Sequence, residues 1–262
     1  MSGNIDVLTA AALAVLVLMI LTWIISILLR DAGIVDIVWG AGFVLVAWVS
    51  YITGDGNSTR SNLLMAMVAA WGARLTIYLW VRNHGKDEDY RYRAMRKRSG
   101  DAFAIRSFFT VFLLQGVLMW TVSLPVQLAM VPASPDVGLL GVVGVAIWGV
   151  GFFFESVGDS QLARFKADPD NEGLLFESGL WKYTRHPNYF GDFCVWWGLF
   201  LVTAETTDAR YAIIGPIVMS IFLIRISGVR LLERSLAKRK PGYEEYVART
   251  SAFIPRPPRK IS

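Results

Sequence analysis

The sequence predicts an all-α integral membrane protein, a bundle of seven transmembrane helices with its N-terminus outside and its C-terminus in the cytoplasm. Of the 262 residues, 54% are hydrophobic, above the roughly 45–50% apolar share of soluble domains. Several apolar runs also approach the roughly 20 residues that a helix needs to cross a bilayer. Lys and Arg lie between these runs in an alternating pattern, which supports the same fold class.

We identify seven apolar runs and expect each to form a transmembrane helix, although the sixth is short. The first run lacks a basic start and is too long for a signal peptide, so we expect it to be retained. The ten Trp and nine Tyr residues, many of them near run ends, suit the aromatic belt at a membrane surface. The runs are 7–29, 34–52, 63–81, 108–130, 137–154, 189–203 and 212–229.

Positive charge is concentrated in three segments, 82–106, 164–185 and 230–262. Loops rich in Lys and Arg face the cytoplasm, and with seven spans all three segments fall on one side. The net charge of +5 is therefore explained by membrane topology, and we expect no nucleic-acid partner. We place the protein in a cell membrane and infer no protein partner.

The sequence argues against a metal centre. Cys194 is the single cysteine, which excludes an intrachain disulfide and any multi-cysteine metal site. His84 and His186 are the two histidines, too few for a histidine-rich site. A P-loop and the GxGxxG dinucleotide motif are also missing, so a bound nucleotide would need another fold.

A dense polar motif, YTRHPNYFGDF at 183–193, comes directly before an apolar run. Pro187 suits the first turn of a helix. Asn188, Asp192 and Trp196 then recur at i, i+4 and i+8 and share one face, with Tyr189 beside them. This face can hold a ligand that has a flat ring and amide or hydroxyl groups. The alternative is the solvated start of an interfacial helix.

A second polar face is expected at the end of the fifth run. Glu155, Asp159 and Lys166 are spaced by four and seven residues, which places them on one helical face. Arg164 lies close by, and fixed Arg or Lys side chains are what phosphates require. A cytoplasmic extension of the helix, with solvated charges, is the alternative.

Asp36 is the one carboxyl within the apolar run 34–52. Such a group is either paired or kept neutral by desolvation. Arg74 in the next run is a candidate partner, and Tyr78 lies four residues further along that face. The sequence leaves two roles for Asp36 open: a catalytic acid with Tyr78, or a structural partner of Arg74.

Three stretches resemble a known family. WGARLTIYLWVRNHGKDEDYRYRAMR, GLWKYTRHPNYFGDF and YEEYVARTSAFIPRPP look like the uncharacterised bacterial branch of the steroid 5-alpha-reductase-like membrane reductases. RHPNYFGD is also similar to the RH-x-NY-x-GD motif of sterol C14- and C7-reductases. The resemblance covers most of the chain and implies an NADPH-dependent enzyme that reduces a carbon–carbon double bond conjugated to a carbonyl.

The resemblance also implies an organisation and a set of site residues. It favours a single membrane-embedded domain, 1–262, with substrate-side helices in 1–135 and a cofactor-binding region in 136–262. The family's Gln-Glu pair and ketone-binding Tyr fall nearest to Asp36 and Trp71 in this sequence. The ketone-binding Tyr is therefore absent or supplied by Tyr78, and the implied catalytic residues are Asp36 and Tyr78. The expected substrate is a steroid-like or other lipid from the surrounding membrane. The implied NADPH contacts are Glu155, Asp159, Arg164, Lys166, Arg185, His186, Asn188, Tyr189, Asp192, Trp196 and Arg230.

The alternative activity is methyl transfer. RHPxYxG also occurs in isoprenylcysteine carboxyl methyltransferases, which bind S-adenosylmethionine. Asn188 and Asp192 match the reductase form of the motif, and seven spans exceed the usual size of the small bacterial methyltransferase relatives. The residues therefore favour the reductase.

Overall fold

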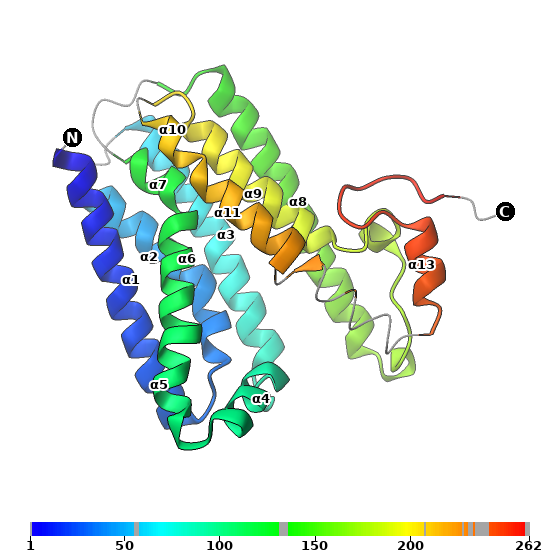
Figure 1. Cartoon of the computed structure of the whole chain (residues 1–262). Coiled ribbons are helices and arrows are strands. Elements are labelled where there is room, and N and C mark those ends of the chain that lie inside the picture. Colours follow the sequence, from blue (N-terminus) through cyan, green and yellow to red (C-terminus); the bar gives the residue numbers. More distant parts are fainter. Residues whose placement is uncertain are drawn as a thin grey trace. The chain divides into compact units, whose positions relative to one another are not determined.

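The protein is all-α in the computed structural model (Figure 1), which describes residues 2–54, 58–130, 136–206, 208–226, 228–229, 233 and 241–259. About 80% of it is helical, and the described ranges contain no strand. Helices suit apolar runs of this kind because a helix satisfies its own backbone groups where water is excluded. The predicted all-α class is confirmed.

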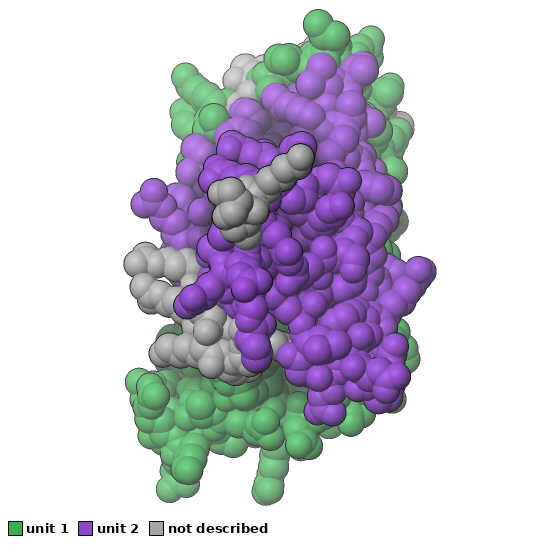
Figure 2. Space-filling view, turned by 90° about the vertical axis from the view of Figure 1, so that its right-hand side faces the viewer, with its two compact units in different colours: residues 1–141, 202–215 green, residues 142–201, 216–262 purple. Residues whose placement is uncertain are grey.

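The chain divides into two compact units (Figure 2). The first contains Met1–Gly141 and Val202–Gly215, and the second contains Val142–Leu201 and Pro216–Ser262. Each unit has its own set of packed helices, so the polar contacts below are given unit by unit.

The first unit begins with three long helices: α1 (Ser2–Leu29), α2 (Ile34–Thr53) and α3 (Thr59–Asn83). Helices α2 and α3 approach closely where Gly40 meets Gly72. A Cβ on Gly40 would lie 2.4 Å from the carbonyl oxygen of Gly72, which no real side chain tolerates. Phe43 and Trp71 fill the buried space beside this crossing, with ring centroids 5.5 Å apart.

The next part of the first unit, from α4 to α7, is a series of short helical segments. Part of the basic segment 82–106 forms α4 (Tyr90–Ser99). The chain continues through a 3-10 turn (Gly100–Ala102), α5 (Phe103–Ser107), a π-helical turn (Phe108–Leu113), α6 (Leu114–Val122) and α7 (Leu124–Leu128). The break between α6 and α7 comes just before Pro125, whose ring cannot sit in a helix interior. Helix α10 (Ala209–Ala212) completes the unit.

The second unit is built on α8 (Leu139–Ala167) and α9 (Pro187–Thr203). Helix α8 continues well beyond the predicted end at 154, and its last turns carry the polar face expected there. Two short 3-10 turns, Pro169–Asn171 and Gly179–Lys182, lie in the connection to α9. Later elements are α11 (Ile214–Ile221), a π-helical turn (Phe222–Ile226) and α13 (Tyr243–Arg249).

Five helical stretches are long and apolar enough to cross a membrane. The runs predicted sixth and seventh form shorter helices, α9 and α11 with its π-helical turn. Large apolar side chains such as Leu13, Val17 and Leu28 on α1 are exposed, as expected where a helix faces lipid. The fold is that of a multi-pass membrane protein. The five stretches are Gly3–Leu29, Ile34–Thr53, Thr59–Asn83, Tyr90–Val122 and Leu139–Ala167.

Candidate functional site

The two predicted polar faces meet in the second unit. Nδ2 of Asn188 on α9 donates a hydrogen bond to Oδ1 of Asp159 on α8, at 3.2 Å. Asp159 and Glu155 are 5% and 4% exposed, so both carboxyl groups lie in the helix contact and not on a solvated surface. The amide oxygen of Asn188 accepts the backbone N–H of Tyr189 at 3.0 Å. The alternative of solvated polar residues is wrong for Glu155 and Asp159.

Glycines let α8 and α9 approach closely enough for this contact. A Cβ on Gly191 would lie 2.5 Å from the backbone nitrogen of Glu155 and 2.6 Å from the carbonyl oxygen of Gly151. A Cβ on Gly158 would lie 3.1 Å from the ring of Pro187. Small residues at such positions are typical of helix contacts in membranes. Close contacts at these glycines therefore fix the distance between α8 and α9 along the polar face.

Asp192 and Trp196 continue this face along α9. Trp196 is fully buried, and Asp192 is half-buried one turn earlier. On the preceding turn, Tyr189 stacks on His186, with ring centroids 5.5 Å apart and planes 9° apart. An amide, carboxylates and aromatic rings thus follow one another along α9 and the facing turns of α8.

The cationic residues predicted beside this face are exposed. Arg164 and Lys166 lie in the last turn of α8 and face solvent, unlike Glu155 and Asp159. The predicted stripe of three residues therefore has two buried members and one exposed member. Arg230, predicted as a phosphate contact, lies outside the described residues.

Arg185 has a different environment from Asn188, although three residues separate them. Its Nε and Nη2 donate to Oε1 of Glu233 at 2.8 and 2.6 Å. Its Nη1 donates to the carbonyl oxygens of Val247, at 3.2 Å, and Thr250. Nε2 of His186 also lies 3.4 Å from Oε1 of Glu233. Arg185 and His186 therefore anchor the chain around α13.

The charge of Glu233 follows from these contacts. Burial alone would raise the pKa of this carboxyl, but hydrogen bonds from His186 and Arg185 outweigh it and hold the pKa below its usual value. Burial also raises the pKa of Tyr243 to about 12, so this phenol stays neutral. The cluster is a neutralised ion pair at physiological pH.

Further hydrogen bonds to backbone carbonyl oxygens join the loop before α9 to α13 and the residues after it. The N–H of Arg185 donates to the carbonyl oxygen of Ser251 at 2.9 Å, and Oγ1 of Thr184 donates to Phe253 at 2.8 Å. The Tyr246 hydroxyl donates to the carbonyl oxygen of Trp181 at 2.5 Å. The described residues after α13, 251–259, contain no helix and are hydrogen-bonded to the loop before α9.

Asp36 makes its described contacts with α4. Its Oδ2 accepts a hydrogen bond from Arg91 at 3.0 Å, and its Oδ1 accepts one from the Tyr92 hydroxyl at 3.1 Å. Arg74 and Arg82, by contrast, each lie 5.7 Å from the ring of Tyr78. The ion-pair partner of Asp36 is thus Arg91, from the basic segment 82–106, and not the candidate Arg74.

A second ion pair holds the same segment against the start of α2. Glu88 accepts hydrogen bonds from Arg96 at 2.7 and 3.1 Å and from the backbone N–H of Ala32 at 2.9 Å. Asp89 caps α4 by accepting from the N–H of Arg91 at 2.8 Å. Contacts on both sides therefore fix Tyr92 next to Asp36.

Comparison with known proteins identifies the family. Residues 22–250 match the family described as "Protein of unknown function (DUF1295)". The chain belongs to this family. The DUF1295 family is known to include steroid 5-alpha-reductase-like proteins. An uncharacterized protein of Schizosaccharomyces pombe is 23% identical over 266 residues, which cover 89% of this chain and 75% of the relative. No solved structure matches the chain.

Three positions of this DUF1295 member gain importance only from the structure. Glu233 accepts from Arg185 and lies beside His186, and Tyr92 is a donor to Asp36. Gln161 accepts the backbone N–H of Leu180 at 3.0 Å and so attaches the loop before α9 to α8. Charge spacing after the last span marks Glu233, whereas Tyr92 lies in a mixed-charge segment that gives no sign of its partner.

Proposed function

We propose that this protein is a membrane-embedded, NADPH-dependent reductase of a carbon–carbon double bond conjugated to a carbonyl group, acting on a steroid-like or other lipid. The contact between Asn188 and Asp159 carries the proposal. It brings an amide and a buried carboxylate together between two closely packed helices. Such groups hydrogen-bond the ribose hydroxyls and the carboxamide of a nicotinamide nucleotide, and buried polar groups in a helix bundle are costly without a role.

The chemistry of the donor set fits a dinucleotide in two respects. The buried carboxyl groups of Glu155 and Asp159 accept hydrogen bonds from hydroxyl groups. Further along α8, the exposed Arg164 and Lys166 supply positive charge for phosphates. When bound, NADPH supplies the hydride, while the residues of α8 and α9 bind and orient the cofactor.

We assign polarisation of the substrate carbonyl to Asp36 together with Tyr92. The Tyr92 hydroxyl is buried and donates to Oδ1 of Asp36 at 3.1 Å, so its proton would turn from Asp36 to the carbonyl oxygen when the substrate binds. A preorganised donor at the oxygen where charge develops is often the largest contribution to catalysis. Tyr78 remains the sequence-predicted alternative to Tyr92, and its described contacts are with Arg74 and Arg82.

The proposed topology has seven spans, with the N-terminus outside and the C-terminus in the cytoplasm of a bacterial cell. It places the segments 82–106, 164–185 and 230–262, where Lys and Arg are concentrated, on the cytoplasmic side. NADPH would then be bound from the cytoplasm and the lipid substrate from the bilayer.

Methyl transfer from S-adenosylmethionine is the second candidate, and one observation favours it. Glu155 and Asp159 are two buried carboxyl groups one turn apart, and such a pair attracts a sulfonium cation as well as hydroxyl groups. The exposed cations at the end of α8 favour a phosphate-bearing cofactor instead.

Titration calorimetry on the detergent-solubilised protein distinguishes the two activities. We expect NADPH to bind and S-adenosylmethionine not to bind. Asp159→Asn should weaken NADPH binding by about tenfold, because a hydrogen bond to a charged group contributes roughly 1.5–3 kcal/mol. Binding of S-adenosylmethionine alone would overturn the reductase proposal, and consumption of NADPH with a lipid enone would then be absent as well.

A further inference from the structure

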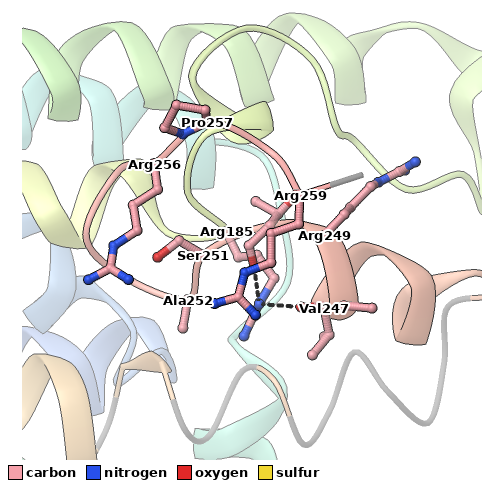
Figure 3. A pocket seen from close by; sticks show the side chains of 10 residues that line it. Arg185, Val247, Arg249, Ser251, Ala252, Arg256, Pro257 and Arg259 are labelled. Atoms are coloured by element: carbon pink, nitrogen blue, oxygen red, sulfur yellow. Dashed lines mark hydrogen bonds between the residues drawn. The ribbon is translucent and has the colours of Figure 1, made fainter. Parts of the chain in front are cut away.

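A separate pocket lies within the second unit, around the loop that follows α13 (Figure 3). Its volume is about 300 Å³, and four arginines line it: Arg185, Arg249, Arg256 and Arg259. Thr250, Ser251 and Ala252 line the same pocket. None of the residues from α8 that carry the proposed function lines this pocket.

Hydrogen bonds at both ends fix the shape of the loop. The backbone N–H of Arg256 donates to the carbonyl oxygen of Tyr183 at 2.9 Å. The backbone N–H of Arg259 donates to the carbonyl oxygen of Arg249, also at 2.9 Å, and closes the loop on itself. Pro255, Pro257 and Pro258 restrict the chain between these points. The arginines therefore project from a constrained backbone (Figure 3).

The charges around the pocket do not balance. Arg185 is neutralised by Glu233 at 2.6 Å, and Arg249 forms an ion pair with Glu177. In the described part of the chain, no carboxylate pairs with Arg256 or Arg259, and both side chains are exposed. The pocket therefore contains two guanidinium groups that no described carboxylate neutralises, together with the hydroxyl-bearing residues Thr250 and Ser251.

We propose that this pocket binds a phosphate group. The planar fork of a guanidinium matches two phosphate oxygens, and an arginine pair gives stronger and more directional binding than lysines. The phosphate belongs either to a soluble nucleotide or to a lipid headgroup, since both offer the same oxygens. The proposal goes beyond the reductase function, because it does not involve Asn188 or Asp159.

Titration of inorganic pyrophosphate into the protein in neutral detergent tests the proposal. The double variant Arg256→Gln/Arg259→Gln should bind pyrophosphate at least about tenfold more weakly than the original protein. The control Lys97→Gln/Arg98→Gln removes the same charge from exposed positions of α4 and should leave affinity unchanged. Arg256→Lys/Arg259→Lys keeps the charge and should lose only part of the affinity.

Equal pyrophosphate affinity in the original protein and in Arg256→Gln/Arg259→Gln would overturn the proposal, as would equal losses in the control. Competition then identifies the source of the phosphate. Displacement of pyrophosphate by adenosine 2′,5′-bisphosphate indicates a nucleotide, and displacement by phosphatidylglycerol but not phosphatidylcholine indicates a lipid headgroup. Because Asn188→Ala leaves this pocket intact, NADPH binding through α8 and α9 can fail without affecting the pyrophosphate result.

Discussion

Two buried arginines, one in each unit, make similar contacts for different purposes. Arg60 donates to the carbonyl oxygens of Val202 and Asp136 and to Oε2 of Glu205, the last at 3.0 Å. Arg185 likewise donates to two carbonyl oxygens and one glutamate. Each arginine thus satisfies backbone groups that would otherwise be buried without a partner.

The difference lies in the other contacts that each glutamate carboxylate makes. Glu205 also accepts the backbone N–H groups of Gly138, at 2.8 Å, and Leu140, at 3.0 Å. It therefore caps the start of α8, where a negative charge is favourable. The Gly138 N–H, together with Arg60, holds the pKa of Glu205 below its usual value. Arg60 and Glu205 join helix ends, and their role is structural.

Glu233 instead gathers Arg185 and His186 from the polar motif before α9. That motif is divided between two tasks. Its first half anchors the segment around α13, and its second half places Asn188 against Asp159. The comparison teaches that a conspicuous arginine and histidine can support the fold next to the residues that we propose as cofactor contacts.

Removing Arg60 should have the largest effect. Arg60→Met leaves Glu205 and two carbonyl oxygens without their donor, and breaking a buried pair costs about 3 kcal/mol or more. We expect the melting temperature in detergent to fall by roughly 6–12 °C. Arg210→Met, which removes an arginine that lies over the exposed Tyr211 ring, is the control and should change it little. Similar melting temperatures in the two variants would contradict a structural role for Arg60.

Removing Arg185 should have an intermediate and more local effect. Arg185→Met should cost about 2 kcal/mol, because Glu233 is more exposed than Glu205 and water can replace part of the lost contact. The segment around α13 should also become more accessible to limited proteolysis, while cleavage in the first unit stays unchanged. An equal increase in cleavage throughout the chain would show that Arg185 does not act locally.

Glu233→Gln should have the smallest effect, and that effect should depend on pH. The pKa of Glu233 lies below its ordinary value of 4.5 in the folded protein. Its stabilising contribution is therefore complete at neutral pH and is lost as the pH falls through the folded pKa. We expect a difference of about 1 kcal/mol or less at pH 7, reduced by solvent screening. Thermal unfolding at pH 7, 5 and 4 should show the difference shrinking below pH 5; a constant difference would contradict the assignment.

Contacts between neighbouring helices were accessible to sequence reasoning. The i, i+4 spacing placed Asn188, Asp192 and Trp196 on one face, and Glu155 and Asp159 on another, because helix geometry alone fixes such positions. Helices that follow each other in the chain usually pack together, so the meeting of the two faces follows from the same pattern. The apolar runs likewise predicted where the helices lie.

Contacts between distant segments were not accessible in this way. Arg91 pairs with Asp36 across 55 residues, and Arg185 pairs with Glu233 across 48. Several Arg residues with the same charge and side-chain length could pair with each carboxylate. Periodicity fixes the direction of a side chain around its own helix but not which distant loop lies against it. The sequence therefore suggested NADPH as the ligand of Arg185, from family resemblance, and Arg74 as the partner of Asp36, from its place in the next helix.

The central claim is that Asn188 holds the cofactor while Arg185 and His186 hold the fold. Calorimetric titration of NADPH into Asn188→Ala tests it most directly, with Asn62→Ala as the control because Asn62 bonds the distant Tyr51 hydroxyl. We predict that Asn188→Ala binds NADPH at least about tenfold more weakly, with a melting temperature close to that of the original protein, and that Asn62→Ala binds it normally. If the original protein binds NADPH and folded Asn188→Ala binds it with the same affinity, the account is contradicted.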